Sequence, residues 1–167
     1  MTNLSEHFTV EEFEYSDTAR VKKLNNKMDE AHRKVAEHTC KYLLEPLRNL
    51  LNQHYGCKVI MKITSGYRGP QLNKAVGGAS TSQHCRAEAT DIDCFKVVET
   101  SKIRIAPSEI YDLIKKWVKE GKISVDQCID ERAGSTTWTH VSHSAWGKTR
   151  DRKQFLLYRG GKYVLDK

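Results

Sequence analysis

The sequence predicts an α+β fold, with one domain, a largely antiparallel sheet and flanking helices. A chain of 167 residues has the size of one domain with a real core. Short segments rich in β-forming residues recur along it, and two longer segments carry apolar residues at helical spacing. Strands interspersed with long helices favour this class. We therefore expect a single domain over residues 1–167.

Residues 1–25 are predicted to form an arm that packs on this domain. The segment is polar with scattered apolar anchors, and Ser5 and Thr9 precede acidic residues. Such positions are helix-start signals, so we expect one short helical turn here. The anchors are Leu4, Phe8, Val10, Phe13 and Tyr15.

The first long helix is expected over residues 26–53. Apolar residues recur there at helical spacing, with polar residues between them. Pro46 lacks a backbone N–H and its ring crowds the preceding turn, so it should kink or divide this helix. Gly56 is the expected end.

The first strand is expected over residues 59–64, which are rich in β-formers. This strand would place Ser65–Arg68 on a turn at its end. Gly69-Pro70 and Gly77-Gly78 punctuate the chain on either side of a predicted short helix. Residues 79–83 are expected to form a polar loop.

A second strand is expected over residues 89–95, followed by a polar connection over residues 97–105. Pro107-Ser108-Glu109 is a helix-start signal, and the apolar stripe that follows it ends at Gly121. We interpret this second long helix as scaffold.

The last third of the chain is predicted to be rich in strands. Residues 125–129 and 137–142 have the strand pattern, and residues 132–136 between them are expected to form a loop. Residues 155–165 contain two adjacent glycines between β-forming runs, which predicts a hairpin.

The composition excludes several classes of protein. No apolar run approaches the length of about 18 residues that a membrane span needs. The first residues lack the basic and apolar regions of a secretory signal, so we expect a chain made in the cytoplasm without a signal peptide. Five cysteines without a C-x-x-C pair favour reduced thiols. The net charge of +7 favours anionic partners, although no basic run with interleaved aromatics predicts a nucleic-acid groove.

Three residues are candidate metal ligands. His84 and Asp91 lie seven positions apart beside a short apolar run, and His140 lies about fifty residues further on. Alternation in the segment around His140 places Trp138, His140 and Ser142 on one face of a strand. Imidazole and carboxylate are ordinary Zn²⁺ ligands, and a catalytic zinc has three protein ligands with a fourth position open. The expected cofactor is therefore Zn²⁺.

Plainer interpretations exist for the same residues. His84 could cap a loop, Asp91 could begin a strand, and His140 could be a core histidine with satisfied hydrogen bonds. Asp93 shares a strand face with Asp91 and is a rival ligand. Cys85 follows His84 and could be a nucleophile or a soft ligand, but a small filler beside the site is the simpler interpretation.

The sequence around these residues resembles that of a known family. Over residues 4–142 the chain is similar to zinc peptidases that cut peptidoglycan stem peptides, a group that includes D-Ala-D-Ala carboxypeptidases and phage L-alanyl-D-glutamate endolysins. The order of the runs is the specific part of this resemblance. The runs are Leu4–Phe13, Leu44–Arg48, Ser65–Arg68, Leu72-Asn73, Val76–Gly78, Ser82–Ile92, Asp126–Glu131 and Trp138–Ser142.

The resemblance implies a fold and a set of roles. The fold would be the one shared by hedgehog domains and D-Ala-D-Ala peptidases. Glu131 would be the general base that accepts a proton from the attacking water, and Arg68 would hold a substrate carboxylate or stabilise developing negative charge. Ser82 and Trp138 would contact substrate. Asp130 is a rival base, but it points to the opposite face of the same strand.

The chain departs from the family at two positions. Ala87 stands where glycine is common, and a Cβ there would be costly if the backbone requires a positive φ. Thr90 stands where alanine is common before the aspartate, which is a small polar change.

The function expected from these observations is hydrolysis of a peptidoglycan stem peptide by a zinc peptidase. The substrate would be the L-Ala-D-Glu or the D-Ala-D-Ala bond, and the enzyme would be a monomer of the phage or prophage type that acts on the wall after lytic release. We expect no membrane span and no nucleic-acid partner. Two other hypotheses are a non-catalytic, zinc-stabilised binding module on the same fold and a basic nucleic-acid-binding protein.

Overall fold

A computed structural model describes residues 1–144 and 151–167. The described strands form one mixed sheet in the order β1-β2-β5-β4-β6-β7, with β3 paired to the second half of β2. Every pairing is antiparallel except that of β4 with β6. The strands are β1 (Val59–Ser65), β2 (Ala89–Val98), β3 (Ser101–Arg104), β4 (Gln127–Ala133), β5 (Thr136–Ser142), β6 (Gln154–Arg159) and β7 (Lys162–Leu165).

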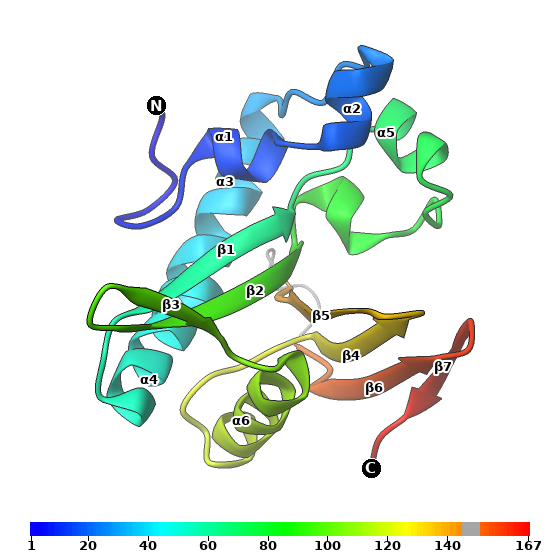
Figure 1. Ribbon diagram of the computed structural model, residues 1–167. Coiled ribbons are helices and arrows are strands. Elements are labelled where there is room, and N and C mark those ends of the chain that lie inside the picture. The colour runs from blue at the N-terminus through cyan, green and yellow to red at the C-terminus, as the bar shows by residue number, and fades with distance from the viewer. Residues whose placement is uncertain (145–150) are drawn as a thin grey trace.

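The helices gather on one side of this sheet and at its upper end (Figure 1). A long helical rod lies behind β1 and β2, and α6 packs against β4 and β5. The helices are α1 (Val10–Glu14), α2 (Asp17–Lys22), α3 (Glu30–Thr39), the π-helical turn η1 (Cys40–Leu44), α4 (Glu45–Tyr55), α5 (Pro70–Ala75), the 3₁₀ turn η2 (Gln83–Arg86) and α6 (Pro107–Lys119). The predicted α+β class is confirmed.

The hydrophobic core lies between one sheet face and the helices. Alternate residues of β2 and β5 enter it, for example Ile92 and Val141, and α4 and α6 contribute buried side chains such as Leu47 and Ile114. The opposite face of the same strands carries polar residues. One face buried and one face solvated is the usual arrangement of an antiparallel sheet.

The first long helix differs from its prediction in its start and in how it divides. It begins at Glu30 rather than near residue 26, because the Asp29 carboxylate caps it by accepting a hydrogen bond from the His32 N–H. The division lies at η1, where the Glu45 N–H bonds the Cys40 carbonyl five residues back. Pro46 follows in the first turn of α4, where its missing N–H is tolerated. The predicted end at Gly56, in the left-handed conformation, is confirmed.

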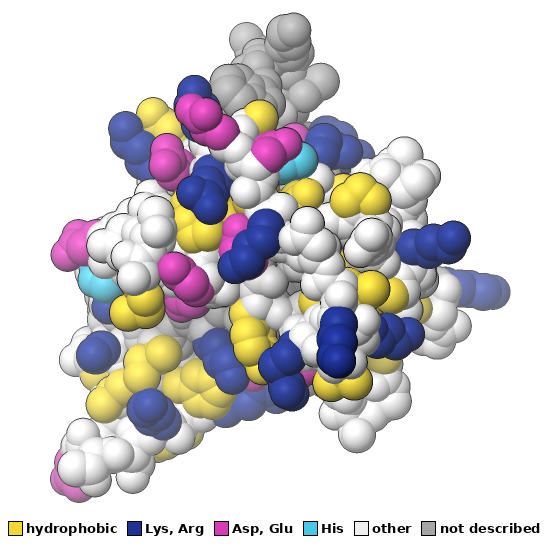
Figure 2. Space-filling model, turned by 90° about the horizontal axis from the view of Figure 1, so that it is seen from above, with side chains coloured by type: hydrophobic (Ala, Val, Ile, Leu, Met, Phe, Trp, Pro, Cys, Tyr) yellow, Lys and Arg dark blue, Asp and Glu magenta, His cyan; other side chains and the backbone are white. Residues whose placement is uncertain are grey.

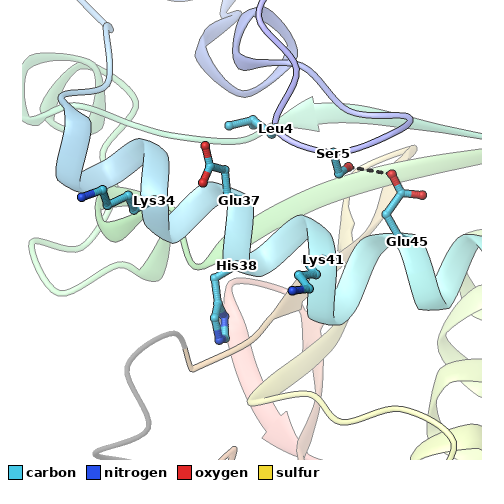
Figure 3. A pocket seen from close by; sticks show the side chains of 7 residues that line it. All are labelled: Leu4, Ser5, Lys34, Glu37, His38, Lys41 and Glu45. Carbon is cyan, nitrogen blue, oxygen red and sulfur yellow. Dashed lines mark hydrogen bonds between the residues drawn. The ribbon is translucent and has the colours of Figure 1, made fainter.

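The N-terminal arm contains two helices, so the prediction of a single turn was wrong. Thr9 caps α1 in a capping box with Glu12, as its position indicated. Ser5 caps no helix; its hydroxyl instead donates a 2.6 Å hydrogen bond to Glu45, which also accepts a bond from the His7 backbone (Figure 3). This contact fastens the arm to α4 beside a pocket of about 420 Å³.

Two further boundaries were predicted incorrectly. The polar connection over residues 97–105 contains β3, which pairs with β2 through its backbone although its side chains are exposed. Solvent on both sides of β3 removes the alternation by which a strand is recognised. The turn between β4 and β5 spans only Gly134 and Ser135, because both strands extend into the expected loop over residues 132–136. The predicted C-terminal hairpin is confirmed as β6 and β7.

One face of the protein carries charged side chains of both signs. Seen from above, Lys and Arg side chains are interspersed with acidic and apolar ones (Figure 2). This face therefore resembles an ordinary solvated surface more than a continuous basic groove. Within the described residues, no helix combines the length and apolar character that a membrane span requires.

Candidate metal centre

Pairing of β2 with β5 places two of the candidate ligands side by side. Asp91 is the direct register partner of His140, and the His140 Nδ1 lies 3.1 Å from Asp91 Oδ1. Both side chains project from the face opposite the core, because their neighbours Ile92 and Val141 are buried in it. The sheet register alone therefore joins residues that are 49 positions apart.

The third candidate, His84, reaches the same point from the turn η2. Its Nε2 lies 3.3 Å from the same Asp91 oxygen, and the side chain is 2% exposed. Its Nδ1 lies 2.8 Å from the Gly66 carbonyl, which can only accept a hydrogen bond. The Nδ1 therefore carries a proton, and Nε2 is the ring nitrogen directed at Asp91. A backbone acceptor of this kind commonly orients a histidine that binds a metal.

The donor set fits a divalent metal such as zinc. One ligand atom from each of His84, Asp91 and His140 lies within 4.8 Å of the others, and among the described residues this is the group with that geometry. Burial would raise the pKa of Asp91, but the two imidazoles outweigh it and hold that pKa well below its usual range. The carboxylate is therefore ionised, as a metal ligand must be.

The rival ligands lie elsewhere. The Asp93 carboxylate accepts a 2.8 Å hydrogen bond from Arg104 Nε, and Asp93 does not belong to the converging group. Cys85 is a free thiol outside that group and outside the lining of the cleft. Both observations favour Asp91 as the acidic ligand and the filler interpretation of Cys85.

The three side chains lie in a cleft of about 900 Å³. Strands β4 and β5 supply Glu131 and Trp138, which are direct partners across the ladder. Arg68 and Ser82 line the same cleft from the segments on either side of α5. The structure thus brings every predicted site residue into one cavity.

Glu131 and Asp130 have different surroundings. Asp130 points away from the cleft and pairs with Arg159 at 2.7 Å. Glu131 faces the cleft, where burial raises its pKa to about 7, helped by the negative charge of Asp91 and opposed by His140 and Arg68. A carboxyl group with a pKa near neutrality is suited to accept and return a proton. We therefore retain Glu131 as the candidate base.

Arg68 has no ionic partner among the described residues. Its backbone N–H donates to the His84 carbonyl at 3.1 Å, which fixes the turn against η2. Its Nε is buried and finds no acceptor within the described part of the chain. The other arginines that line the cleft are engaged, Arg86 with Glu88 and Arg152 with Asp126. Arg68 is thus the guanidinium that remains available to an anionic ligand.

Close packing requires two of the glycines in the sequence runs that resemble the family. A Cβ on Gly66 would lie 2.7 Å from the Phe13 backbone oxygen, so the turn can approach α1 only with glycine there. A Cβ on Gly78 would overlap the Asn73 side chain, whose Nδ2 donates to the carbonyls of Gly78 and Ala79. These contacts shape the loop that carries His84 and the side of the cleft that carries Arg68.

The role of Gln83 was not evident from the sequence. Its Nε2 donates to Asp126 at 2.9 Å, and Arg152 grips the same carboxylate with two nitrogens. The bond joins the metal loop to the start of β4, the strand that carries Glu131. Sequence alone cannot reveal this link, because the residues are 43 positions apart and both types are usually surface residues.

Ala87 adopts a left-handed conformation, with φ of 59°. Its side chain is buried, and its carbonyl accepts a hydrogen bond from Thr39. The conformation costs about 1 kcal/mol for a residue with a Cβ. The backbone cost expected for a Cβ at this position is therefore present in the loop. The candidate ligands are nevertheless in place.

A comparison with protein families decides the identity. A family model described as Peptidase M15 matches residues 6–111, which is more than half of the chain. The protein belongs to the Peptidase M15 family. No curated protein sequence matches the chain.

Membership of the Peptidase M15 family makes the protein a peptidase of a metal-dependent family, and this agrees with the α+β fold. The match includes Arg68, His84 and Asp91 but ends before Glu131 and His140. The two later residues are therefore supported by their place in the cleft of this M15 peptidase.

We predict that the protein purified without added metal contains about one zinc ion per chain. His84→Ala and His140→Ala should each lose most of it, because two protein ligands hold zinc poorly. Elemental analysis of the purified variants is the measurement. His54→Ala, at an exposed position of α4, is the control and should retain the metal. Unchanged zinc in both cleft variants would refute the ligand set.

The raised pKa of Glu131 predicts that the free energy of unfolding of the metal-free protein depends on pH. The folded chain binds a proton at Glu131 up to a pH of about 7, whereas the usual value is 4.5. Stability therefore falls as the pH rises through this window. Glu131→Gln should stabilise the metal-free protein at pH 8 by about 1–3 kcal/mol and have little effect at pH 4.

Urea unfolding at both pH values, in the presence of a chelator, measures this difference. Asp130→Asn is the matched control, because it breaks the buried pair with Arg159 and should destabilise the protein. A Glu131→Gln variant that is less stable than wild type at pH 8 would contradict the prediction.

Proposed function

We propose that this M15 peptidase is a zinc enzyme that hydrolyses peptidoglycan stem peptides, at either the L-Ala-D-Glu or the D-Ala-D-Ala bond. The observation that carries the proposal is the convergence of His84, Asp91 and His140 in a cleft that also holds a buried carboxyl group, Glu131. The sequence runs of these peptidases, in their family order, support the substrate class.

His84, Asp91 and His140 would hold the zinc, which would supply Lewis acidity to activate water at neutral pH and to polarise a carbonyl. Glu131 accepts the proton of the attacking water and delivers it to the leaving amine. Burial raises the pKa of Glu131 in the metal-free cleft, which favours return of the proton to the amine. Trp138, its partner across the ladder, lowers this pKa and so favours the ionised form.

Arg68 binds the negative charge of the substrate. Stem peptides carry free carboxylates, and Arg68 is the guanidinium in this cleft without a partner among the described residues. Its planar fork matches a carboxylate in two hydrogen bonds, and its charge stabilises the developing oxyanion. Ser82 accepts a 3.3 Å hydrogen bond from the His84 N–H, so it orients the loop and lies within the cleft lining beside the substrate.

The decisive experiment is digestion of purified cell wall followed by mass spectrometry. New N-terminal D-Glu identifies the endopeptidase, and released D-Ala identifies the carboxypeptidase. Glu131→Gln should keep its zinc and lose at least about 100-fold in kcat. Asp130→Asn should lose much less, because its side chain faces away from the cleft. Bound zinc without either product would favour a binding module on this fold.

Arg68→Ala is predicted to lose about 10- to 150-fold in kcat/KM while zinc content is unchanged. Arg68→Lys should recover only part of the loss, because a point charge cannot form the planar pair. The effect should be largest on peptides with a free carboxylate near the scissile bond and small on their amidated forms. Equal losses on both forms would exclude carboxylate recognition by Arg68.

A further inference from the structure

The C-terminal hairpin extends the active-site cleft beyond the part of the chain that matches the family. Strands β6 and β7 add two strands to the sheet beyond β4, and Leu156 and Tyr163 from them line the cleft. Both residues lie outside the matched residues 6–111. The hairpin is therefore a feature of this chain that the family match leaves without a role.

The register of the sheet places Tyr163 in line with the candidate base. Glu131 on β4 is the partner of Tyr158 on β6, and Tyr158 is the partner of Tyr163 on β7. Partners in neighbouring strands project from the same face of a sheet. The Tyr163 side chain thus rises from the face that carries Glu131, two strands further out.

The hydroxyl of Tyr163 is available to bind a ligand. The ring stacks on Tyr158 with centroids 4.7 Å apart, yet the residue remains 59% exposed. Within the described residues no side chain or backbone group bonds its hydroxyl, whereas Tyr15, Tyr55 and Tyr111 each donate to a carboxylate.

The charges in the cleft keep this hydroxyl a donor. Burial raises the pKa of Tyr163, and the carboxylates of Glu131 and Asp91 raise it further. The phenol therefore stays protonated at any pH at which the protein would work. A neutral O–H facing a peptide can donate to a carbonyl oxygen without adding charge.

Tyr163 and Arg68 enter the cleft from opposite edges of the sheet. Arg68 follows β1 at one end of the sheet, Tyr163 lies on β7 at the other, and Asp91 and His140 lie on the strands between them. A peptide bound in this cleft beside Arg68 and the candidate ligands can therefore contact the hairpin.

We propose that Tyr163 is a substrate-binding residue, whose hydroxyl donates a hydrogen bond to a backbone carbonyl oxygen of the peptide held between the hairpin and Arg68. The proposal rests on the proposed peptidase function. It makes the β6–β7 hairpin a determinant of which peptides this M15 peptidase accepts.

Tyr163→Phe tests the hydroxyl while keeping the ring stack. Its kcat/KM on a synthetic stem pentapeptide should fall about 10-fold, the scale of one hydrogen bond to substrate, with zinc content and melting temperature unchanged. Tyr42→Phe is the control, because it removes the hydroxyl of another exposed tyrosine, on η1 and outside the cleft lining. It should change kcat/KM less than about twofold.

Binding provides a second readout that does not depend on turnover. In the Glu131→Gln background, calorimetry should show weaker binding of the same pentapeptide by Tyr163→Phe than by Tyr42→Phe. Equal kcat/KM and equal affinity for these two variants would overturn the role of Tyr163 while leaving the peptidase intact. A wild type that neither binds nor cuts the pentapeptide would instead overturn the proposed function, and this inference with it.

Discussion

The antiparallel pairing of β2 with β5 is the interaction on which the site depends. It sets Asp91 opposite His140 and turns both away from the core, so that two ligands meet without any dedicated loop. A slip of one residue would turn His140 into the core and bring Val141 to the cleft. The core prevents such a slip, because the Val141 and Thr139 side chains are fully buried on the other face and Thr139 hydrogen-bonds the Pro107 carbonyl of α6.

The remaining ligand is fixed by backbone contacts around η2. The Gly66 carbonyl orients the His84 ring, the Arg68 N–H holds the His84 carbonyl, and both depend on a turn packed tightly against Phe13 of the arm. The N-terminal arm is thereby part of the support of the metal centre. The Gln83–Asp126 bond adds a link to β4, so the loop and the strand with the candidate base are held together. Supporting contacts of this kind commonly govern metal affinity as strongly as the ligands themselves.

Several ionisable groups of the cleft have unfavourable electrostatic surroundings in the metal-free protein. In the metal-free protein, the buried Glu131 carboxyl faces the ionised Asp91, and the unpaired Arg68 is partly shielded from water. A divalent cation would offset the negative charge of Asp91, and an anionic substrate would provide the partner that Arg68 lacks. The left-handed Ala87 adds local strain at the same loop. Such conflicts with stability are typical of functional sites.

The sequence by itself determined the fold class, most of the strands and helices, and the candidate residues His84, Asp91, His140, Glu131 and Arg68. Local patterns predict the elements and the three candidate ligands, because strand alternation, helical spacing and metal-ligand residue types are visible in short windows. The roles of Glu131 and Arg68 are what the resemblance to peptidoglycan peptidases implies. Only the tertiary structure shows the contacts that favour Asp91 over Asp93 and Glu131 over Asp130, since they involve partners such as Arg104 and Arg159 from distant segments. Strand β3, the anchoring of Ser5 by Glu45, the Gln83–Asp126 link and the reach of Tyr163 into the cleft were likewise decided there. The physical reason is that sheet register and packing bring together residues whose chemistry has no signature in the local sequence.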